Sequence, residues 1–90
     1  MNQGFMRSSM SDVVVWSKDA CFYCQMAKNL LELKEIEFEE RNTTLSEQTR
    51  AEFFEAMPDA KTLPQIFIDG EHIGGFTELQ KYLKDSESNG

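Results

Sequence analysis

The sequence contains few of the residues that would place it among disulfide-stapled secreted proteins, membrane proteins or nucleic-acid-binding proteins. It has two cysteines in 90 residues, whereas a small secreted domain held by disulfides usually carries more, at wider spacing. No apolar run approaches the ~20 residues that a membrane span requires. Lysine and arginine number 9 against 16 acidic residues, a net charge of -7, which disfavours nucleic acid and anionic membranes because both require a basic surface.

What remains is the composition of one globular domain. Hydrophobic residues make up 40% and charged residues 28% of the chain, as in ordinary soluble domains, and the negative charge favours a monomer. Residues 1–11 have one arginine and no apolar core segment, so they do not form a secretory signal. We expect a disordered leader or expression remnant over residues 1–11, the domain over residues 12–85, a polar tail over residues 86–90, and a cytoplasmic location.

The hydrophobic patterns predict seven elements in the order β-α-β-α-β-β-α. Asp69-Gly70 between two strand-like runs predicts a hairpin. The expected fold class is therefore α/β, with one four-stranded mixed sheet that has helices on both faces and begins with a parallel β-α-β unit. The predicted strands cover residues 13–16, 36–41, 65–69 and 71–73, and the helices cover residues 21–34, 46–57 and 76 or 77 to about 85. The inner face of the second helix is expected to hold Phe53, Phe54 and Met57, and one face of the third helix is expected to hold Leu79, Tyr82 and Leu83.

Both cysteines lie in one motif, Cys21-Phe22-Tyr23-Cys24, at the start of the first predicted helix. A thiol attacks a disulfide only as its thiolate, and a free cysteine has a pKa of about 8.5. A helix N-terminus carries partial positive charge and unpaired backbone N–H groups, which favour the Cys21 thiolate, and Lys18 adds positive charge three residues earlier. Cys24 lies one turn deeper on the same face. We therefore predict that Cys21 is the exposed nucleophile and Cys24 the resolving thiol.

Two structural explanations of the cysteine pair compete with redox chemistry. A structural zinc ion requires about four cysteine or histidine ligands, and the chain offers two cysteines and His72. Two unrelated cysteines buried on one helix are the other alternative, since cysteine is often simply buried. A CxxC that directly follows a strand and opens a helix is typical of redox proteins, and we expect no metal.

Two further segments suit a substrate site. Pro64 follows Thr62 and Leu63 and enters the third strand. It is either a plain strand boundary or a cis proline, and we predict the cis form, in which the Leu63 backbone is free to pair with an extended peptide. Gly74-Gly75 is either a plain turn or a backbone nest that leads into a helix N-terminus and binds a carboxylate.

Taken together, three motifs resemble the glutaredoxin family. They are Lys18-x-x-Cys21-x-Tyr23-Cys24, the run from Thr62 to Ile68, and His72-Ile73-Gly74-Gly75, and the similarity covers residues from about 12 to 83. The resemblance implies a thioredoxin-like fold, glutathione as cosubstrate, and reduction of protein disulfides and of protein–glutathione mixed disulfides. It implies disulfide-containing or glutathionylated proteins as partners, with ribonucleotide reductase as one family expectation.

Carried over position by position, the resemblance implies roles for individual residues. Cys21 matches the nucleophile and Cys24 the resolving thiol. The matches to glutathione-binding residues are Lys18, Tyr23, Thr62, Leu63, Pro64, Gly75, Phe76 and Thr77, of which the last three mark the place where the γ-glutamyl carboxylate docks. Arg50 and Lys61 are looser matches for the glycyl carboxylate.

Three positions depart from the family pattern. Phe22 stands where the commonest dithiol members have proline, Phe76 replaces a frequent cysteine, and Thr77 stands where many members have aspartate. Glu78 is the candidate to supply the missing negative charge near the glutamyl ammonium group.

Two other functions compete with a glutathione-dependent enzyme. One is a redoxin recharged by a flavoprotein reductase, and the other is a dimeric module that holds an iron–sulfur cluster through Cys21 and external glutathione. Lys18 and residues 74–77 favour glutathione over the flavoprotein. The bulk of Phe22 and the nearby Cys24 favour disulfide chemistry over a cluster.

Overall fold

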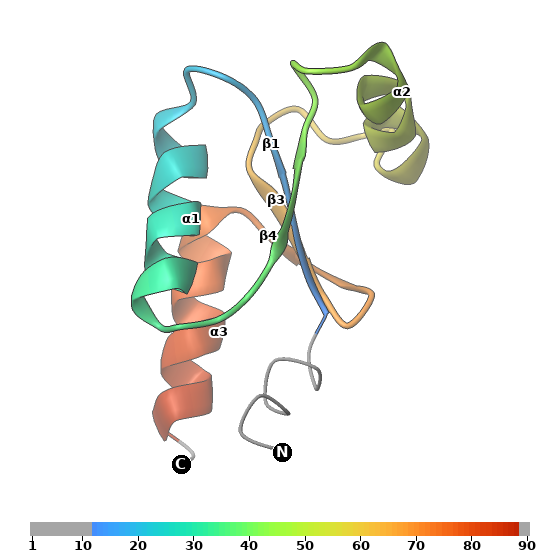
Figure 1. Ribbon diagram of the computed structural model, residues 1–90. Coiled ribbons are helices and arrows are strands. Elements are labelled where there is room, and N and C mark those ends of the chain that lie inside the picture. The colour runs from blue at the N-terminus through green and yellow to red at the C-terminus, as the bar shows by residue number, and fades with distance from the viewer. Residues whose placement is uncertain (1–11, 89–90) are drawn as a thin grey trace, which may run out of the picture.

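The computed structural model describes residues 12–88 and confirms the predicted order of seven elements. The leader expected over residues 1–11 and the last two residues of the expected tail lie outside this range. Figure 1 shows a central sheet with helices on both of its sides. The elements are β1 (Val13–Ser17), α1 (Phe22–Leu33), β2 (Glu39–Asn42), α2 (Glu47–Ala56), β3 (Gln65–Ile68), β4 (Glu71–Gly74) and α3 (Phe76–Ser88).

The four strands form one mixed sheet in the order β2-β1-β3-β4. β1 pairs with β2 in parallel, so that Val14 lies opposite Glu39, and with β3 in antiparallel fashion, so that Val14 lies opposite Phe67. β3 and β4 form the predicted hairpin, in which Asp69 and Gly70 have φ angles of 55° and 83°, as a two-residue hairpin turn requires. The mixed sheet and its parallel β-α-β unit are thus confirmed.

β2 begins at Glu39, later than the alternating pattern from residue 36 predicts. Ile36 and Phe38 do face inward, since both pack against the core cluster that contains residues of α1 and α3. They lie in irregular backbone because the Ile36 N–H closes the end of α1 by donating to the carbonyl oxygen of Leu31 at 2.9 Å. The alternating pattern therefore begins in the segment that leads into the sheet, and pairing with β1 begins only at Glu39.

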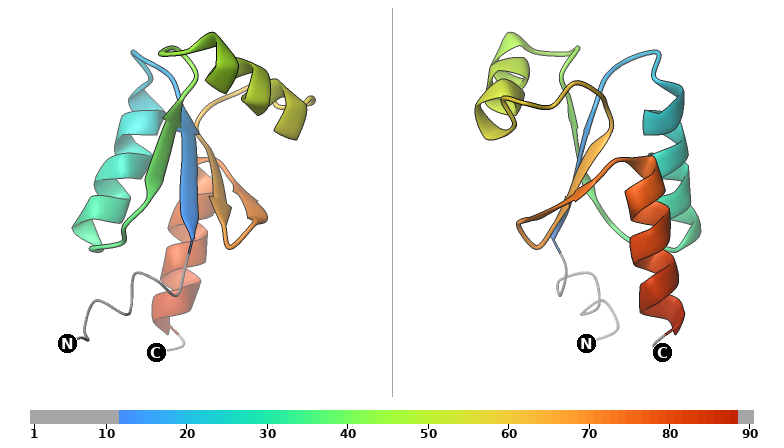
Figure 2. Two further views of the ribbon diagram at one scale, coloured as in Figure 1. Left: turned by 45° about the vertical axis from the view of Figure 1, so that its right-hand side comes forward. Right: turned by 180° about the vertical axis from the view of Figure 1, so that it is seen from behind.

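Two apolar clusters hold the layers together, one on each face of the sheet. Figure 2 shows the helices on these two faces, with α1 and α3 on one side and α2 on the other. Successive strand residues point to opposite faces, so Val15 and Trp16 of β1 enter different clusters. The smaller cluster joins Trp16 to Phe53 and Met57 of the α2 layer, with the Trp16 and Phe53 rings 5.7 Å apart. The larger cluster joins β1 and β3 to α1 and α3 and consists of Val13, Val15, Ala27, Leu31, Ile66, Ile68, Leu79 and Leu83.

One residue expected on the inner face of the second helix lies at the surface. Phe54 is 48% exposed, so that prediction is wrong. Successive helical residues point about 100° apart, and Phe53 rather than Phe54 is turned toward the sheet. The Arg50 guanidinium lies over the Phe54 ring instead, 5.6 Å from its centroid. In the third helix, Leu79 and Leu83 are buried, whereas Tyr82 is 39% exposed at the edge of their face. α3 continues to Ser88 and so includes residues 86–88, where the polar tail was expected to begin.

α1 ends in a Schellman turn whose left-handed residue is not glycine. Glu35 has a φ angle of 60°, a conformation that glycine adopts without steric cost. Its N–H donates to the Glu32 carbonyl oxygen at 3.0 Å, while the Ile36 N–H donates to that of Leu31. For a residue with a Cβ atom this backbone costs roughly 1–2 kcal/mol.

Glu35→Gly should therefore raise the free energy of unfolding by about 1 kcal/mol, because glycine removes the Cβ atom that opposes the left-handed backbone. Urea unfolding of the oxidised protein, followed by circular dichroism, measures the change. Glu32→Gly is the matched control, since the same substitution inside α1 should lower stability by about 1 kcal/mol. Equal losses in the two variants would contradict this assignment of the turn.

Candidate active site

The CxxC motif lies where β1 gives way to α1. β1 ends at Ser17, and Cys21 is the N-cap residue of α1, with extended backbone angles. The Cys21 sulfur accepts a hydrogen bond from the backbone N–H of Cys24 at 3.2 Å, which satisfies one of the donors that a helix N-terminus leaves unpaired. A sulfur thus holds the place that the side-chain oxygen of serine, threonine or aspartate usually takes.

Cys21 and Cys24 form a disulfide, with their Cα atoms 5.2 Å apart. They differ in accessibility, because Cys24 is 1% exposed whereas Cys21 is partly exposed. Phe22 and Tyr23 between them project into solvent. A large substrate can therefore reach Cys21 directly but not Cys24.

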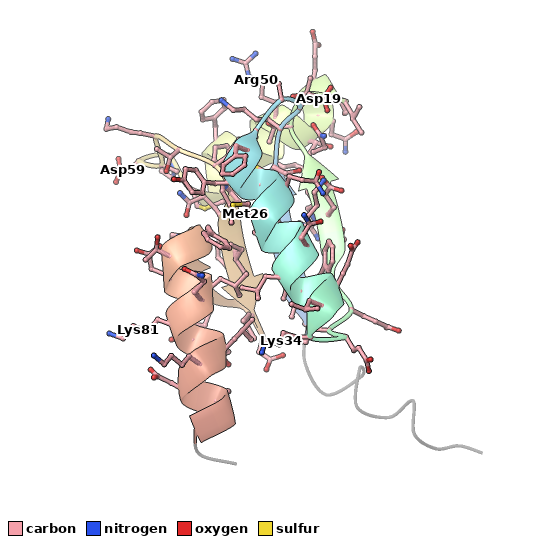
Figure 3. All side chains as sticks on the ribbon, turned by 90° about the vertical axis from the view of Figure 1, so that its left-hand side faces the viewer. Asp19, Met26, Lys34, Arg50, Asp59 and Lys81 are labelled. Carbon is pink, nitrogen blue, oxygen red and sulfur yellow. A yellow bond between two sulfur atoms is a disulfide. The ribbon has the colours of Figure 1, made fainter. Side chains whose placement is uncertain are left out.

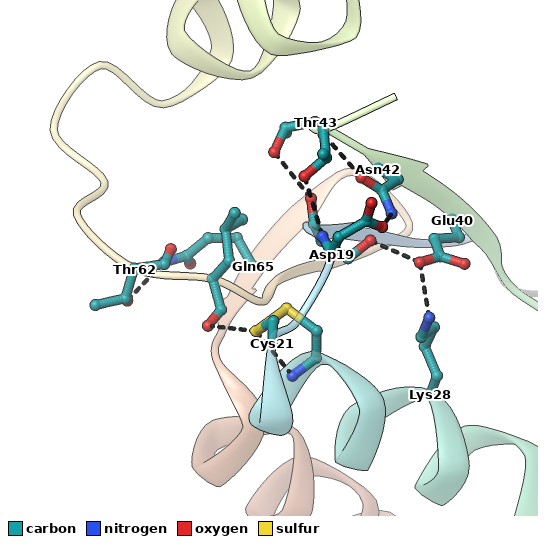
Figure 4. The surroundings of a disulfide bond; sticks show 12 residues. Asp19, Cys21, Lys28, Glu40, Asn42, Thr43, Thr62 and Gln65 are labelled. Atoms are coloured by element: carbon teal, nitrogen blue, oxygen red, sulfur yellow. Dashed lines mark hydrogen bonds and ion pairs between the residues drawn. A yellow bond between two sulfur atoms is a disulfide. The ribbon is translucent and has the colours of Figure 1, made fainter. Parts of the chain in front are cut away.

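The loop before β3 brings a backbone carbonyl group to the exposed sulfur. The peptide bond between Leu63 and Pro64 is cis, which confirms the prediction from the sequence. The carbonyl oxygen of Leu63 lies 3.6 Å from the Cys21 sulfur (Figure 4). The segment from Thr62 to Pro64 thus adjoins the sulfur, where a molecule bonded to Cys21 would meet it.

The start of α3 adjoins the same loop. A Cβ atom on Gly75 would lie 3.5 Å from the carbonyl oxygen of Pro64. The Phe76 ring lies 6.0 Å from the Tyr23 ring, and Tyr23 in turn lies 5.3 Å from the Phe22 ring. The structure therefore brings together most of the predicted site residues, namely Cys21, Cys24, Tyr23, Thr62, Leu63, Pro64, Gly75, Phe76 and Thr77.

The start of α3 is capped by one of its own side chains. Glu78 Oε1 accepts a hydrogen bond from the Gly75 N–H at 2.9 Å, which is the return half of a capping box. Gly74 makes room for this side chain, because a Cβ atom at that position would lie 2.8 Å from Glu78 Cγ. Gly74 also has a φ angle of 124°. The Glu78 carboxylate is thus engaged at the helix N-terminus, next to the place expected to bind a ligand carboxylate.

Three predicted basic residues are not tied into this arrangement. Lys18 is exposed and has no hydrogen-bonding or ion-pairing partner within residues 12–88. Arg50 lies on α2, and Lys61 is exposed in the loop after it. Figure 3 shows Arg50 at the end of the molecule that carries Asp19, with Lys81 toward the other end. No contact within the described residues places any of the three against Cys21.

Hydrogen bonds from the end of β2 hold the loop that precedes Cys21. Thr43 donates to the carbonyl oxygen of Ser17 from its N–H at 2.8 Å and from its hydroxyl group at 3.0 Å. The Asp19 N–H donates to Thr44 Oγ1 at 3.0 Å. These contacts fix where the chain leaves the sheet, and so where Cys21 begins α1 (Figure 4).

A hydroxyl, a carboxylate and an ammonium group join β1, β2 and α1 beside the site. Glu40 Oε2 accepts hydrogen bonds from Ser17 Oγ at 2.6 Å and from Lys28 Nζ at 2.8 Å. Burial raises the pKa of Glu40, but the hydrogen bonds from Lys28 and Ser17 and the charge of Lys28 outweigh it, so the net pKa is lower than usual. The ionised carboxylate therefore stabilises the attachment of α1 to the sheet.

Sequence reasoning missed the polar side chains that support the site. Gln65 bonds to both Thr62 and His72, but in the sequence it is one residue of a strand. Glu40 belongs to the polar half of an alternating run and carries no signal of its partners. For Glu78 the sequence offered one signal, because a glutamate three residues after the N-cap Gly75 can make the return half of a capping box.

The described residues contain no group of three or more histidine, cysteine, aspartate or glutamate side chains that could hold a metal ion. Within the same range, no helix is both long enough and apolar enough to cross a membrane.

A CxxC at the N-cap of the first helix of a β-α-β-α-β-β-α fold, with a cis-proline loop against its sulfur, defines a thioredoxin-fold thiol–disulfide protein. Comparison with known proteins narrows this class, because the glutaredoxin family model matches residues 13–73. Glutaredoxin 3 of Escherichia coli K12 is 39% identical over 70 residues, which are 78% of this chain and 83% of that protein. Glutaredoxin 1 of Rickettsia prowazekii is 32% identical over 80 residues, 88% of this chain and 84% of that protein.

Solved structures agree with the sequence relatives. The crystal structure of glutaredoxin 1 from Francisella tularensis complexed with cacodylate has a TM-score of 0.72 and 34% identity, covering 87% of this chain and 98% of that chain. The crystal structure of the buckwheat glutaredoxin–glutathione complex has a TM-score of 0.72 and 25% identity, and the match covers 86% of this chain and 72% of that chain. The chain belongs to the glutaredoxin family and has its thioredoxin-like fold. It is a thiol–disulfide oxidoreductase with the CxxC disulfide typical of dithiol members.

Glu40→Gln should lower the free energy of unfolding by about 0.5–1 kcal/mol at pH 7, because it removes the charge that pairs with Lys28. The lowered pKa of Glu40 contributes stability that is present above the unfolded-state value and is lost as pH falls through the folded-state value. The difference between the variant and the wild type should therefore shrink as the pH falls from 7 toward 3. Urea unfolding of the oxidised proteins at pH 7 and pH 3 measures this. Glu37→Gln, which alters an exposed carboxylate, should match the wild type throughout, and a Glu40→Gln deficit that is as large at pH 3 as at pH 7 would refute the ionic explanation.

Proposed function

We propose that this oxidoreductase is a dithiol glutaredoxin that uses glutathione to reduce protein disulfides and glutathione mixed disulfides, with Cys21 as nucleophile and Cys24 as resolving thiol. The observation that carries the proposal is the asymmetry of the pair. Cys21 is partly exposed at a helix N-cap, and Cys24 is buried one turn along the same helix. The nucleophile has to meet the substrate, whereas the resolving thiol has to meet only the nucleophile.

Removal of glutathione from a protein requires Cys21 alone. Its thiolate attacks the glutathione sulfur of the mixed disulfide, and the protein sulfur leaves as a thiolate that takes a proton from solvent. A second glutathione thiolate then attacks the glutathione sulfur bonded to Cys21, which forms oxidised glutathione and restores the Cys21 thiolate. The helix N-terminus and the Cys24 N–H, 3.2 Å from the Cys21 sulfur, favour that thiolate.

Reduction of a protein disulfide requires both cysteines. Cys21 attacks one sulfur of the substrate, whose other sulfur leaves as a thiolate and is protonated by solvent. Cys24 then attacks the Cys21 sulfur, which releases the first substrate sulfur as a thiol and forms the disulfide present in the structure. Two glutathione molecules reduce this disulfide and are oxidised to one disulfide. The attack by Cys24 crosses one helical turn, so its effective concentration is high.

We propose that glutathione binds across the surface around Cys21. The Leu63 backbone pairs with the cysteinyl part, since the Leu63 carbonyl oxygen lies 3.6 Å from the sulfur to which that cysteine becomes bonded. The glutathione complex of the buckwheat relative supports this choice of ligand. The proposed binding residues are Lys18, Tyr23, Thr62, Leu63, Pro64, Gly75, Phe76 and Thr77.

The two carboxylates of glutathione require local positive potential, because the protein as a whole has a net charge of -7. The N–H groups of Phe76 and Thr77 open α3 and lack intrahelical partners, whereas the Gly75 N–H is bonded to Glu78. We therefore assign the γ-glutamyl carboxylate to the Phe76 and Thr77 N–H groups, and we assign Lys18 as the second source of positive charge.

We further propose a monomer in the cytoplasm, where the glutathione pool keeps such a pair reduced. Its protein substrates would be disulfide-containing or glutathionylated proteins, of which ribonucleotide reductase is a candidate. An assay with a small glutathione mixed disulfide, glutathione and glutathione reductase tests the function directly. If a flavoprotein reductase but not glutathione reduces the Cys21–Cys24 disulfide, the protein is instead a redoxin recharged by a flavoprotein. A brown, dimeric preparation would instead identify a module that holds an iron–sulfur cluster.

Lys18→Glu should raise the KM for glutathione about two- to fivefold, because an exposed charge interaction is worth about 0.2–1 kcal/mol and the substitution reverses it. The difference from the wild type should shrink at high salt, which screens exposed charges. Steady-state rates against glutathione concentration at two ionic strengths measure both effects. Lys81→Glu makes the same change in net charge on α3 and should leave KM unchanged. Equal effects of the two substitutions would attribute the change to net charge and reject a local role of Lys18.

Cys21→Ser should abolish both reactions, because the chain has no other cysteine with an exposed sulfur. Cys24→Ser should keep deglutathionylation within about threefold of the wild type and lose at least about tenfold in reduction of a protein disulfide, because the second reaction depends on intramolecular attack. The mixed-disulfide assay and reduction of a disulfide-bonded protein separate the two. Activity retained by Cys21→Ser, with loss of both reactions in Cys24→Ser, would reverse the assignment.

A further inference from the structure

A buried amide supports the loop that carries Leu63. Gln65 is 8% exposed, and its Nε2 donates to the carbonyl oxygen of Thr62 at 3.0 Å, with Thr62 Oγ1 at 3.5 Å. On its other side, Gln65 Oε1 lies 2.7 Å from Nε2 of His72. The side chain therefore connects β4 to the loop through the first residue of β3.

The hydrogen bonds fix which way the amide points and which nitrogen of His72 carries a proton. The carbonyl oxygen of Thr62 can only accept, so the amide nitrogen of Gln65 has to face it. Gln65 Oε1 then faces His72, whose Nε2 must be protonated in order to donate to it. A reversed amide would set two carbonyl oxygens against each other.

The His72 ring is itself held in place. It stacks on the Phe67 ring with centroids 4.9 Å apart and an angle of 23° between the planes. The register between β3 and β4 shifts here, because Phe67 pairs with His72 while Ile66 pairs with Gly74. Such irregularities change the direction in which nearby side chains point. Here the His72 side chain points toward Gln65.

Apolar packing and hydrogen bonds both hold the loop. The Leu63 side chain packs against the cluster of Trp16, Phe53 and Met57, and Pro64 is buried. Within the described residues, the hydrogen bonds that tie residues 61–63 to the sheet come from Gln65. The carbonyl oxygen of Leu63 lies 3.6 Å from the Cys21 sulfur, and it follows Thr62 directly in the chain. Figure 4 shows Thr62 and Gln65 on the same side of Cys21. Apolar packing fixes the Leu63 side chain, and the amide supplies the hydrogen bonds that hold the adjacent Thr62 backbone.

We propose that Gln65, oriented by His72, is a positioning residue that holds the Leu63 backbone against Cys21. It touches neither the reacting sulfur nor the proposed ligand and acts through Thr62. The proposal rests on the proposed function in one respect, because its kinetic consequence appears in the KM for a glutathione mixed disulfide. A second consequence does not depend on glutathione. A carbonyl oxygen beside a cysteine accepts a hydrogen bond from the thiol and repels the thiolate, so release of the loop should favour the Cys21 thiolate.

Gln65→Leu keeps most of the side-chain volume and removes the hydrogen bonds to Thr62 and to His72. We expect the KM for the mixed disulfide to rise about three- to tenfold, the effect of losing about one hydrogen bond, with kcat changed less than twofold. The pH midpoint for alkylation of Cys21 in the reduced protein should fall. Gln48→Leu is the matched control, since Gln48 is exposed on α2 and bonds to Glu52 of the same helix, and it should behave as the wild type in both assays.

His72→Phe preserves the stacking on Phe67 and removes the donor to Gln65, so it tests the proposal even if Gln65→Leu fails to fold. It should raise KM about twofold, and the double variant should match Gln65→Leu, because His72 acts through Gln65. Wild-type KM and alkylation midpoint in both variants, or a fall in kcat with KM unchanged, would overturn the proposal. A different result would refute the proposed function and retain the positioning role. In that case the wild-type protein shows no activity with glutathione, while Gln65→Leu still lowers the pH midpoint for alkylation of Cys21.

Discussion

The hydrogen bond from the Cys24 N–H to the Cys21 sulfur is the interaction on which the rest of the site depends. It makes a reactive atom the N-cap of α1, so the start of the helix and the position of the nucleophile are one constraint. A shift of the helix start by one residue would rotate the sulfur about 100° around the axis and displace it about 1.5 Å. The bonds from Thr43 to Ser17 prevent this by fixing where β1 ends.

Several features of the site depend on residues that are close together in the sequence, and these features could be predicted from the sequence. The Asp69-Gly70 pair predicts its hairpin because the turn type depends on those two residues. The spacing of Cys21 and Cys24 places both sulfurs within one helical turn. Pro64 at the entrance to a strand pointed to the cis peptide bond that the structure contains. The element order followed, because each element has its own pattern of apolar residues.

The remainder depends on contacts between segments that are distant in the chain. The start of β2 is set by its pairing with β1 and by the turn at the end of α1, so the alternation that includes Phe38 could not locate it. Phe53 and Phe54 are equally apolar, and which one is buried depends on the packing of α2 against Trp16 and its neighbours in the sheet. Gln65 acquires its role from His72 and Thr62, whose places on a neighbouring strand and a loop no single-sequence pattern records.

The contact between Gly74 and Glu78 has a consequence for how this protein can diverge. A Cβ atom at position 74 would meet Glu78 Cγ at 2.8 Å, and the backbone there already has a φ angle of 124°. Any single substitution of Gly74 is therefore disfavoured both by the contact with Glu78 and by the backbone conformation. A substitution that first shortens Glu78 removes its hydrogen bond to the Gly75 N–H at the start of α3. A change at position 78 would relieve the steric contact but not the backbone strain, so position 74 should stay glycine. Variation in ligand preference among descendants should therefore accumulate at Thr77 rather than at position 74.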